Sequence, residues 1–107
     1  MLGRMGQHPE LPIPLLREFC IRWKIRELSV FGSYLREDFG PASDIDFLAT
    51  FASDARWSLF DEVTMIEELQ RIVGRRVDLV ARDALAASEN YIRREEIFST
   101  ARTLYAA

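Results

Sequence analysis

Apolar residues recur along the chain at two spacings, and each spacing predicts one kind of element. Steps of three and four residues after Pro14 predict a helix over residues 14–24. The same spacing predicts a second helix that starts after Ser58 and ends before Gly74. Ser58 and Asp61 match a capping box, and glycine is common where a helix ends. We expect both helices to bury one face in a core.

Three shorter apolar runs predict strands, over residues 28–31, 44–51 and 76–81. In the second run, acidic and apolar residues alternate, so Asp44 and Asp46 fall on the face opposite to Ile45, Phe47, Ala49 and Phe51. In the third run, Asp78 falls opposite to Val77 and Leu79. The pattern therefore predicts a small sheet with an apolar face and a face that carries three aspartates.

Glycine, proline and serine mark the connections between these runs. Gly32-Ser33 starts a turn in which Ser33 is placed to cap a short helix over residues 34 to 37 or 38, and Gly40-Pro41 ends that helix. Beyond the third strand we expect a turn over residues 83–87 and a long helix over residues 89–105. Apolar and charged residues mix in this last helix, so the pattern does not define its buried face.

The order of elements predicts an α/β (α+β) fold, in which a small mixed β-sheet carries helices mainly on one face. A length of 107 residues fits a single domain over residues 1–107. Residues 1–12 hold glycines and prolines without an apolar period, and they are expected to form a flexible arm. Hydrophobic residues make up 49% of the chain and charged residues 29%, which predicts a packed core rather than disorder.

Composition and charge exclude several classes of function. A net charge of −3 argues against direct nucleic-acid binding, which needs a basic face. No apolar run approaches the ~20 residues of a membrane span, and no signal-peptide pattern opens the chain. The one cysteine, Cys20, lies in an apolar run and is expected in the core, which fits a reducing cytoplasm.

The aspartates of the two later strands form a candidate metal site. Asp44 and Asp46 stand two residues apart, so their side chains share a face with Cα atoms roughly 6.5–7 Å apart. Asp78 joins them if its strand lies beside theirs. Carboxylates ~4 Å apart repel by about 4 kcal/mol per pair at an effective dielectric near 20, so the cluster needs positive charge. Mg²⁺ prefers carboxylate and phosphate oxygens, and two such ions serve nucleotidyl transfer.

The Gly-Ser turn supplies groups that suit a phosphate. Gly32 lets an anion approach the backbone closely, and Ser33 offers a hydroxyl and an N–H group. The free N–H groups at the start of the short helix would face that anion. Arg36 stands three residues after Ser33, on nearly the same helix face, and its guanidinium can donate two parallel hydrogen bonds to phosphate. The turn therefore predicts a site for a nucleotide's phosphates beside the carboxylates.

Each of these features has a plainer explanation when it is taken alone. An Asp-x-Asp pair on a strand is usually solvent-facing polarity, a Gly-Ser pair is usually a turn, and Arg36 is usually a surface charge. Their conjunction differs, because four specified positions match by chance in roughly one chain in 10³ of this length. The order strand, turn, helix, strand and the third aspartate make a chance match rarer still.

The chain resembles the DNA polymerase β-type nucleotidyltransferase superfamily in Gly32-Ser33, Arg36, Asp44-Ile45-Asp46 and Val77-Asp78-Leu79. Its length, the helix that leads into residues 75–80 and the start of the last helix at residues 91–93 resemble the minimal nucleotidyltransferase (MNT) family. Members of that family are the antitoxins of HEPN–MNT toxin–antitoxin pairs. The resemblance covers about residues 15–105. One departure is Glu37, where family members often have glycine, and an acid beside the phosphate turn is expected to weaken nucleotide binding.

The resemblance implies a role for each matched residue. Asp44 and Asp46 would bind two Mg²⁺ ions, and Asp78 would bind the catalytic ion and help to deprotonate the acceptor hydroxyl. The triphosphate of ATP would be held by Gly32, Ser33 and Arg36. The implied reaction is attack of a hydroxyl on the α-phosphate of ATP with release of pyrophosphate. The implied acceptor is a tyrosine of a partner HEPN toxin, which the added AMP silences, and a hetero-oligomer with that toxin is expected.

Two other functions stay open at this point. A non-catalytic antitoxin would mask the toxin by binding alone, and an Asp44→Ala variant would then still neutralise it. Transfer to a small-molecule hydroxyl, such as that of an aminoglycoside, is disfavoured because no second domain is present to build that pocket. The aromatic residues of the last predicted helix would either dock a protein or complete the core: Tyr91, Phe98 and Tyr105.

Overall fold

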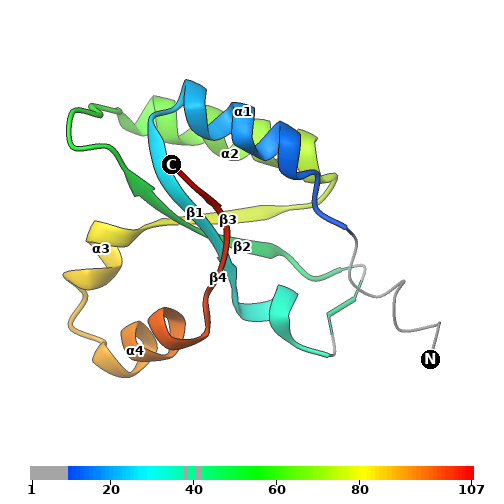
Figure 1. Ribbon diagram of the computed structural model, residues 1–107. Helices are drawn as coiled ribbons and strands as arrows, with labels where there is room; N and C mark the ends of the chain where they lie inside the picture. The colour runs from blue at the N-terminus through cyan, green and yellow to red at the C-terminus, as the bar shows by residue number, and fades with distance from the viewer. Residues whose placement is uncertain (1–9, 38, 41) are drawn as a thin grey trace.

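The computed structural model describes residues 10–37, 39–40 and 42–107, and its elements form three layers (Figure 1). In chain order they are α1 (Ile13–Arg22), β1 (Ile25–Phe31), the 3₁₀ helix η2 (Gly32–Leu35), β2 (Ile45–Phe51), α2 (Leu59–Val73), β3 (Val77–Ala81), α3 (Arg82–Ala86), α4 (Tyr91–Thr100) and β4 (Arg102–Ala106). In this part of the chain, no helix has the length and apolar character needed to cross a membrane.

The four strands form one mixed sheet in the order β3-β2-β1-β4. Strand β1 runs antiparallel to both β2 and β4, whereas β2 and β3 run parallel. The parallel register places Ile45 beside Val77 and Asp46 beside Asp78. The expected α/β class with a small mixed sheet is confirmed.

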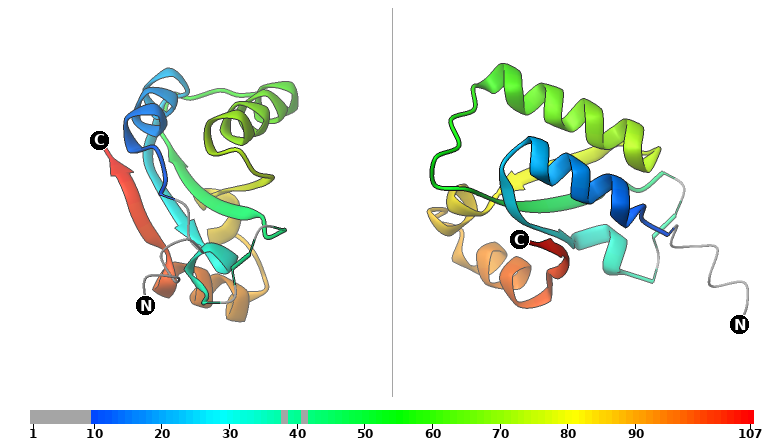
Figure 2. Two further views of the ribbon diagram at one scale, coloured as in Figure 1. Left: turned by 90° about the vertical axis from the view of Figure 1, so that its right-hand side faces the viewer. Right: turned by 45° about the horizontal axis from the view of Figure 1, so that its top comes forward.

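Helices α1 and α2 cover one face of the sheet and enclose the main core (Figure 2). The alternation predicted for β2 is present, because Ile45, Phe47 and Ala49 are fully buried on this face. Cys20 on α1 is buried in the same core, as expected, and burial raises the pKa of its thiol to about 12. The thiol therefore stays protonated and serves as a small apolar side chain.

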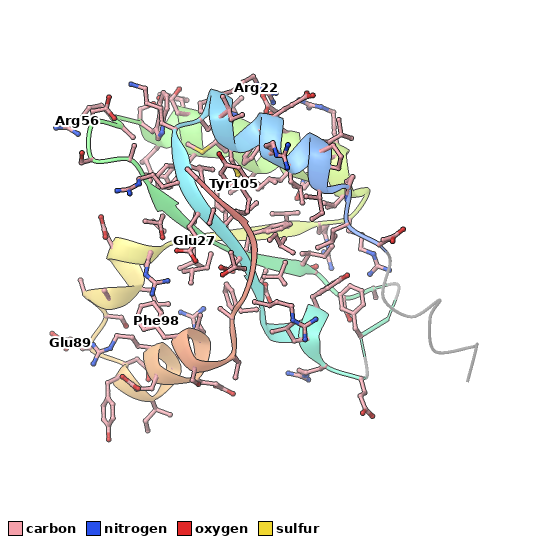
Figure 3. The ribbon with its side chains drawn as sticks, viewed as in Figure 1. Arg22, Glu27, Arg56, Glu89, Phe98 and Tyr105 are labelled. Carbon is pink, nitrogen blue, oxygen red and sulfur yellow. The ribbon has the colours of Figure 1, made fainter. Side chains whose placement is uncertain are left out.

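The other face of the sheet is partly covered by α3 and α4. A second buried cluster joins these helices to β1 and β2 through Phe31, Leu48, Leu85 and Ile97. Phe98 of α4 packs against this cluster, and the guanidinium carbon of Arg82 lies 4.6 Å from the centre of its ring (Figure 3). The shorter helices therefore cover the part of this face where these buried side chains lie.

The expected long helix over residues 89–105 is wrong in its second half. Helix α4 ends at Thr100, and residues Arg102–Ala106 form the edge strand β4, whose Ala106 and Tyr105 pair with β1. Tyr105 lies on this strand and packs against the main core, whereas Tyr91 at the start of α4 is 61% exposed. The pairing with β1 is a long-range contact, and it overrides the local pattern that suggested helix.

Several smaller expectations also need correction. The short helix begins at Gly32 rather than Tyr34, and no side chain caps it, so the predicted Ser33 cap is wrong. Strand β1 begins three residues earlier than residue 28, at Ile25. Residues 1–9 of the expected arm, together with Asp38 and Pro41, lie outside the described residues.

Helix α2 has the ends that its sequence predicts. The Ser58 hydroxyl accepts a hydrogen bond from the Asp61 amide, and the Asp61 carboxylate accepts one from the Ser58 amide. Gly74 ends the helix in the left-handed region, at φ +73°. These contacts satisfy backbone groups that a helix leaves unpaired at its ends.

Replacing Ser58 with alanine is expected to remove the capping box and to lower the free energy of unfolding by about 0.5–2 kcal/mol. Urea denaturation measures the change. A Ser58→Thr variant keeps the hydroxyl, so its free energy of unfolding should fall much less than that of Ser58→Ala. Equal losses in the two variants would show that the cap hydrogen bond contributes nothing.

The two tryptophans meet where α1 ends and α2 is about to begin. The ring centres of Trp23 and Trp57 lie 5.1 Å apart in an edge-to-face arrangement. The indole N–H of Trp57 donates to the Trp23 carbonyl, and that of Trp23 donates to Glu68. This pair joins the loop after β2 to both helices.

Candidate active site

Two of the three candidate carboxylates lie side by side on neighbouring strands. Asp46 and Asp78 are register partners in the parallel β2–β3 ladder, so their side chains leave the same face of the sheet. This is the face opposite to α1 and α2, since Ile45 and Phe47 occupy the other face. Asp78 is exposed and Asp46 is half-buried. The sheet therefore brings the pair together on this face, at its β3 edge.

Asp44 lies one residue before β2 and faces a cation. The Nε atom of Arg76, which lies one residue before β3, stands 3.2 Å from Oδ1 of Asp44. That oxygen is buried and has no hydrogen-bond partner, so the contact is an ion pair without hydrogen-bond geometry. Arg76 is thus the charge partner of Asp44 in this structure.

The Gly-Ser turn packs directly against Asp46. Gly32 has φ +66°, and a Cβ atom added there would collide with Oδ2 of Asp46. The same Oδ2 accepts a hydrogen bond from the Ser33 amide at 3.4 Å. Only glycine fits this position, because a side chain would be strained by the backbone and would displace the carboxylate.

A cavity of about 440 Å³ opens beside this turn. Its lining includes the sequence-predicted residues Gly32, Ser33, Arg36 and Asp46. Asp44 and Asp78 do not line it, so they lie beside the cavity rather than in its wall. The remaining polar lining comes from α4, through Arg93, Glu96 and Thr100. Sequence reasoning missed these three, although their spacing places them on one helix face.

The surroundings of Asp46 disfavour its charge. Burial raises the pKa of Asp46 above its ordinary value of 3.8, and the carboxylates of Asp78 and Asp44 raise it further. The hydrogen bond from the Ser33 amide and the charge of Arg93 act in the opposite direction. Asp78 and Asp44 are thus close enough to act on Asp46, which is the electrostatic condition expected of a cation site.

This donor set fits a divalent cation such as Mg²⁺. Asp46 and Asp78 offer carboxylates in direct register, and Asp44 offers a buried oxygen without a hydrogen-bond partner. Within the described residues, however, no three acidic, histidine or cysteine side chains stand close enough to form a ready-made metal cage. Phosphate oxygens of a substrate would therefore have to complete the coordination.

Arg75 holds the loop that leads to Asp44, a role that the sequence did not suggest. Its guanidinium donates to the carbonyls of Gly40 and Ser43, at 2.6 and 3.2 Å, and lies over the Phe39 ring. Arg75 therefore fixes the chain just before the first aspartate of the Asp-x-Asp pair.

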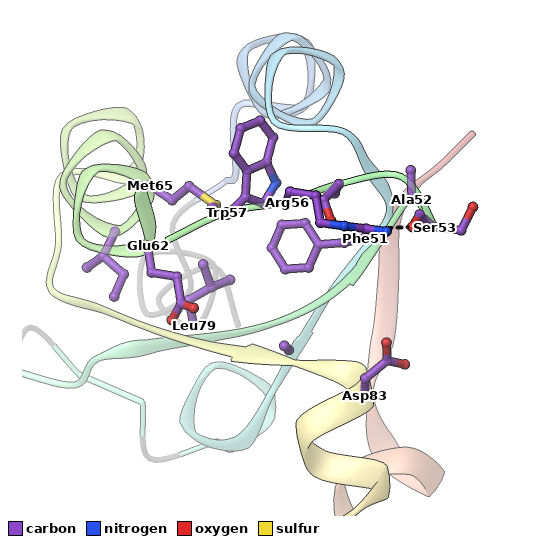
Figure 4. A pocket seen from close by; sticks show the side chains of 12 residues that line it. Phe51, Ala52, Ser53, Arg56, Trp57, Glu62, Met65, Leu79 and Asp83 are labelled. Carbon is purple, nitrogen blue, oxygen red and sulfur yellow. Dashed lines mark hydrogen bonds between the residues drawn. The ribbon is translucent and has the colours of Figure 1, made fainter. Parts of the chain in front are cut away.

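A second cavity, of about 330 Å³, lies on the α2 side of the sheet, between α2 and the loop after β2 (Figure 4). The guanidinium of Arg56, at its wall, donates to the Ser53 and Ala55 carbonyls. Leu79 lines this cavity. Because neighbouring residues of a strand point to opposite faces, the cavity lies on the face of the sheet opposite to Asp78. This cavity lacks the carboxylate pair and the Gly-Ser turn, and it is separate from the candidate active site.

The chain belongs to the family described as nucleotidyltransferase domain, whose model matches residues 14–102. Among its relatives, the protein adenylyltransferase MntA of Thermococcus cleftensis is 38% identical over 69 residues, which cover 64% of this chain and 68% of that protein. Across the first relatives matched, the aligned stretch spans 64%, 68% and 72% of their own length.

Solved structures agree with this assignment and confirm the resemblance to the minimal branch of the family. A minimal nucleotidyltransferase is 28% identical and superposes with a TM-score of 0.66 over 84% of this chain and 86% of its own. A toxin–antitoxin with AMP-PNP gives a TM-score of 0.69 at 18% identity, over 91% and 75%. An MNT antitoxin in complex with a tri-AMPylated HEPN toxin of Shewanella oneidensis gives 0.58 at 22% identity, over 89% and 66%.

Proposed function

We propose that this chain is an antitoxin that transfers AMP from ATP to a tyrosine hydroxyl of a HEPN-type toxin, with Mg²⁺ as cofactor, and so neutralises the toxin. The observation that carries the proposal is the direct register of Asp46 and Asp78 beside the Gly32-Ser33 turn. Relatives support it, because one is a protein adenylyltransferase and another is an antitoxin bound to an AMPylated HEPN toxin.

Each predicted site residue has a role in the proposed reaction. Gly32, Ser33 and Arg36 bind the triphosphate in the cavity and point its α-phosphate towards the aspartates. Asp44, Asp46 and Asp78 hold the metal ions. When bound by these carboxylates, Mg²⁺ would supply positive charge that offsets the negative charge developing during the transfer. The hydroxyl oxygen forms a bond to the α-phosphorus, the bond to pyrophosphate breaks, and Asp78 helps to remove the hydroxyl proton.

The exposure of Asp78 favours an acceptor that arrives from outside the chain. Asp78 is exposed, and the face around it is covered only at one end, by α3 and α4. Asp78 lines neither the cavity beside the Gly-Ser turn nor the cavity on the α2 side of the sheet. A protein that presents a hydroxyl on its own surface can reach the aspartates directly, and a hetero-oligomer with the toxin would hold it there.

The test uses the purified chain, ATP, Mg²⁺ and the HEPN protein encoded beside it. Mass spectrometry should show the HEPN protein heavier by one or more AMP groups on tyrosine, and its toxicity should fall in parallel. Omission of Mg²⁺ or an Asp78→Asn variant should prevent both changes. If an Asp44→Ala variant neutralises the toxin as well as the natural chain does, the protein masks its partner by binding alone and the transfer proposal is wrong.

A further inference from the structure

Helix α4 forms a wall of the candidate nucleotide cavity. Arg93, Glu96, Ile97 and Thr100 line the cavity together with the Gly-Ser turn. Their spacing of three, four and seven residues places them on one helix face. Ile97 is only 5% exposed and belongs to the buried cluster under α4, so the helix is fixed with this face towards the cavity. The polar side chains of that face therefore stand opposite Gly32 and Ser33.

Arg93 differs from the other arginines of α3 and α4 in having no contact that holds it. The guanidinium of Arg94 donates to the Ser88 carbonyl at 2.7 Å, and that of Arg82 lies over the Phe98 ring. The side chain of Arg93 makes no hydrogen bond and no ion pair within the described residues, although its charge acts on Asp46. A cation that lines a cavity and has no partner there is available to an anionic ligand.

The charges around the cavity show why a triphosphate needs this cation. Arg36 brings one positive charge to the lining, whereas Asp46 and Glu96 bring two negative charges that repel phosphate. Ions on the aspartates would offset the repulsion from Asp46, but Glu96 lies on α4 and is not one of the proposed metal ligands. Arg93 stands one helical turn from Glu96 on the same helix face, so its positive charge offsets the negative charge of Glu96.

We propose that Arg93 binds the triphosphate of the nucleotide from the α4 side, so that α4 and the Gly32-Ser33 turn clamp it between them. This inference rests on the proposed function, because it assumes that a nucleoside triphosphate fills the cavity. Arginine suits the task because its planar guanidinium has five donors and no acceptor, which matches phosphate oxygens and not the mixed donors and acceptors of a base.

The experiment compares the natural chain with Arg93→Ala, Arg93→Lys and the matched control Arg71→Ala, in which an exposed arginine is removed from α2 on the other face of the sheet. Calorimetry in the presence of Mg²⁺ measures the affinity for ATP and for inorganic triphosphate. Arg93→Ala should weaken both by about 10- to 100-fold, the usual effect of losing a charge-assisted hydrogen bond. The affinity of Arg93→Lys for both ligands should lie between those of the natural chain and Arg93→Ala, because lysine keeps the charge and loses the planar guanidinium.

Two further readouts separate a phosphate contact from a structural role. The melting temperature of Arg93→Ala should equal that of the natural chain, since Arg93 holds nothing in the fold. The salt dependence of triphosphate binding should become shallower in Arg93→Ala, because one cation fewer faces the anion. Arg71→Ala should match the natural chain in affinity and in salt dependence.

The outcomes distinguish this inference from the proposed function. Unchanged affinity of Arg93→Ala for both ligands, or weaker ATP binding with unchanged triphosphate binding, overturns the phosphate contact. A natural chain that binds ATP but never modifies the HEPN protein overturns the proposed acceptor and leaves the Arg93 result valid. A natural chain that binds no nucleotide overturns both.

Discussion

Replacing Asp46 with asparagine is expected to abolish AMP transfer and, at the same time, to make the protein more stable. In the proposed function this carboxylate holds metal beside the Gly32-Ser33 turn, and metal catalysis supplies several kcal/mol, so the rate should fall on the order of 10³-fold. The amide oxygen of asparagine can still accept the hydrogen bond from the Ser33 amide. The turn should therefore keep its shape in the variant.

The gain in stability follows from the raised pKa of Asp46. Because the folded state holds this proton more tightly than the unfolded state, stability of the natural chain falls as pH rises from the ordinary value of 3.8 through the raised folded pKa. Asp46→Asn lacks this loss. Urea denaturation should show that Asp46→Asn has a higher free energy of unfolding than the natural chain. This difference should be absent in acid below the ordinary pKa and complete at neutral pH. Mg²⁺ should reduce this difference in free energy of unfolding, because it binds and stabilises only the natural chain.

A less stable Asp46→Asn variant at neutral pH would show that the carboxylate is not under repulsion. Transfer at the natural rate would show that the reaction does not use it. Asp61→Asn offers a comparison, since Asp61 caps α2 on the other face of the sheet. That variant should lose stability and keep its activity.

Replacing Gly32 with alanine is expected to remove nucleotide binding and transfer together. A methyl group at this position collides with Oδ2 of Asp46, and the backbone there has φ +66°. The left-handed backbone alone costs about 1–2 kcal/mol for a residue other than glycine. Relief of the collision moves either the turn or the carboxylate, so transfer should fall as far as in Asp46→Asn.

Gly74 supplies the matched control for this substitution. It has nearly the same backbone angle, φ +73°, but a Cβ atom there meets nothing within 4 Å. Gly74→Ala should therefore lose a similar 1–2 kcal/mol of backbone energy. ATP affinity by calorimetry and AMP transfer should be normal in Gly74→Ala and lost in Gly32→Ala. Equal activity of the two variants would show that the contact between Gly32 and Asp46 has no part in the site.

The sequence alone predicted those parts of the fold whose pattern is local. The helix α1, the capping box at Ser58 and the alternation along β2 each lie within a short stretch, and the structure has all of them. The apolar stripe expected for α2 is present only in part, because Leu69 is buried whereas Leu59 and Val63 are 77% and 54% exposed. The candidate aspartates could be placed on one face for the same reason, because strand alternation fixes the side on which a residue falls. That placement depended on β2 and β3 being neighbours, which the parallel register satisfies.

The features that the sequence did not reveal depend on contacts between distant segments. Strand β4 follows α4 after a single residue, and only its pairing with β1 makes residues 102–106 extended. Thr103 and Tyr105 are residues with some strand preference, which was the one local signal. Arg93 and Arg75 take their roles from the cavity and the loop that the folded chain brings to them. Spacing along α4 gave no hint of what its polar face would meet.

The pairing of Trp23 with Trp57 has a practical consequence for spectroscopy of this protein. Both indoles of the chain belong to that pair, which neither lines the nucleotide cavity nor touches the aspartates. Intrinsic emission should therefore change when the corner between α1 and α2 melts, and stay constant as ATP is titrated. Fluorescence studies of ligand uptake consequently need a dye or a labelled nucleotide, whereas those of denaturation need no label at all.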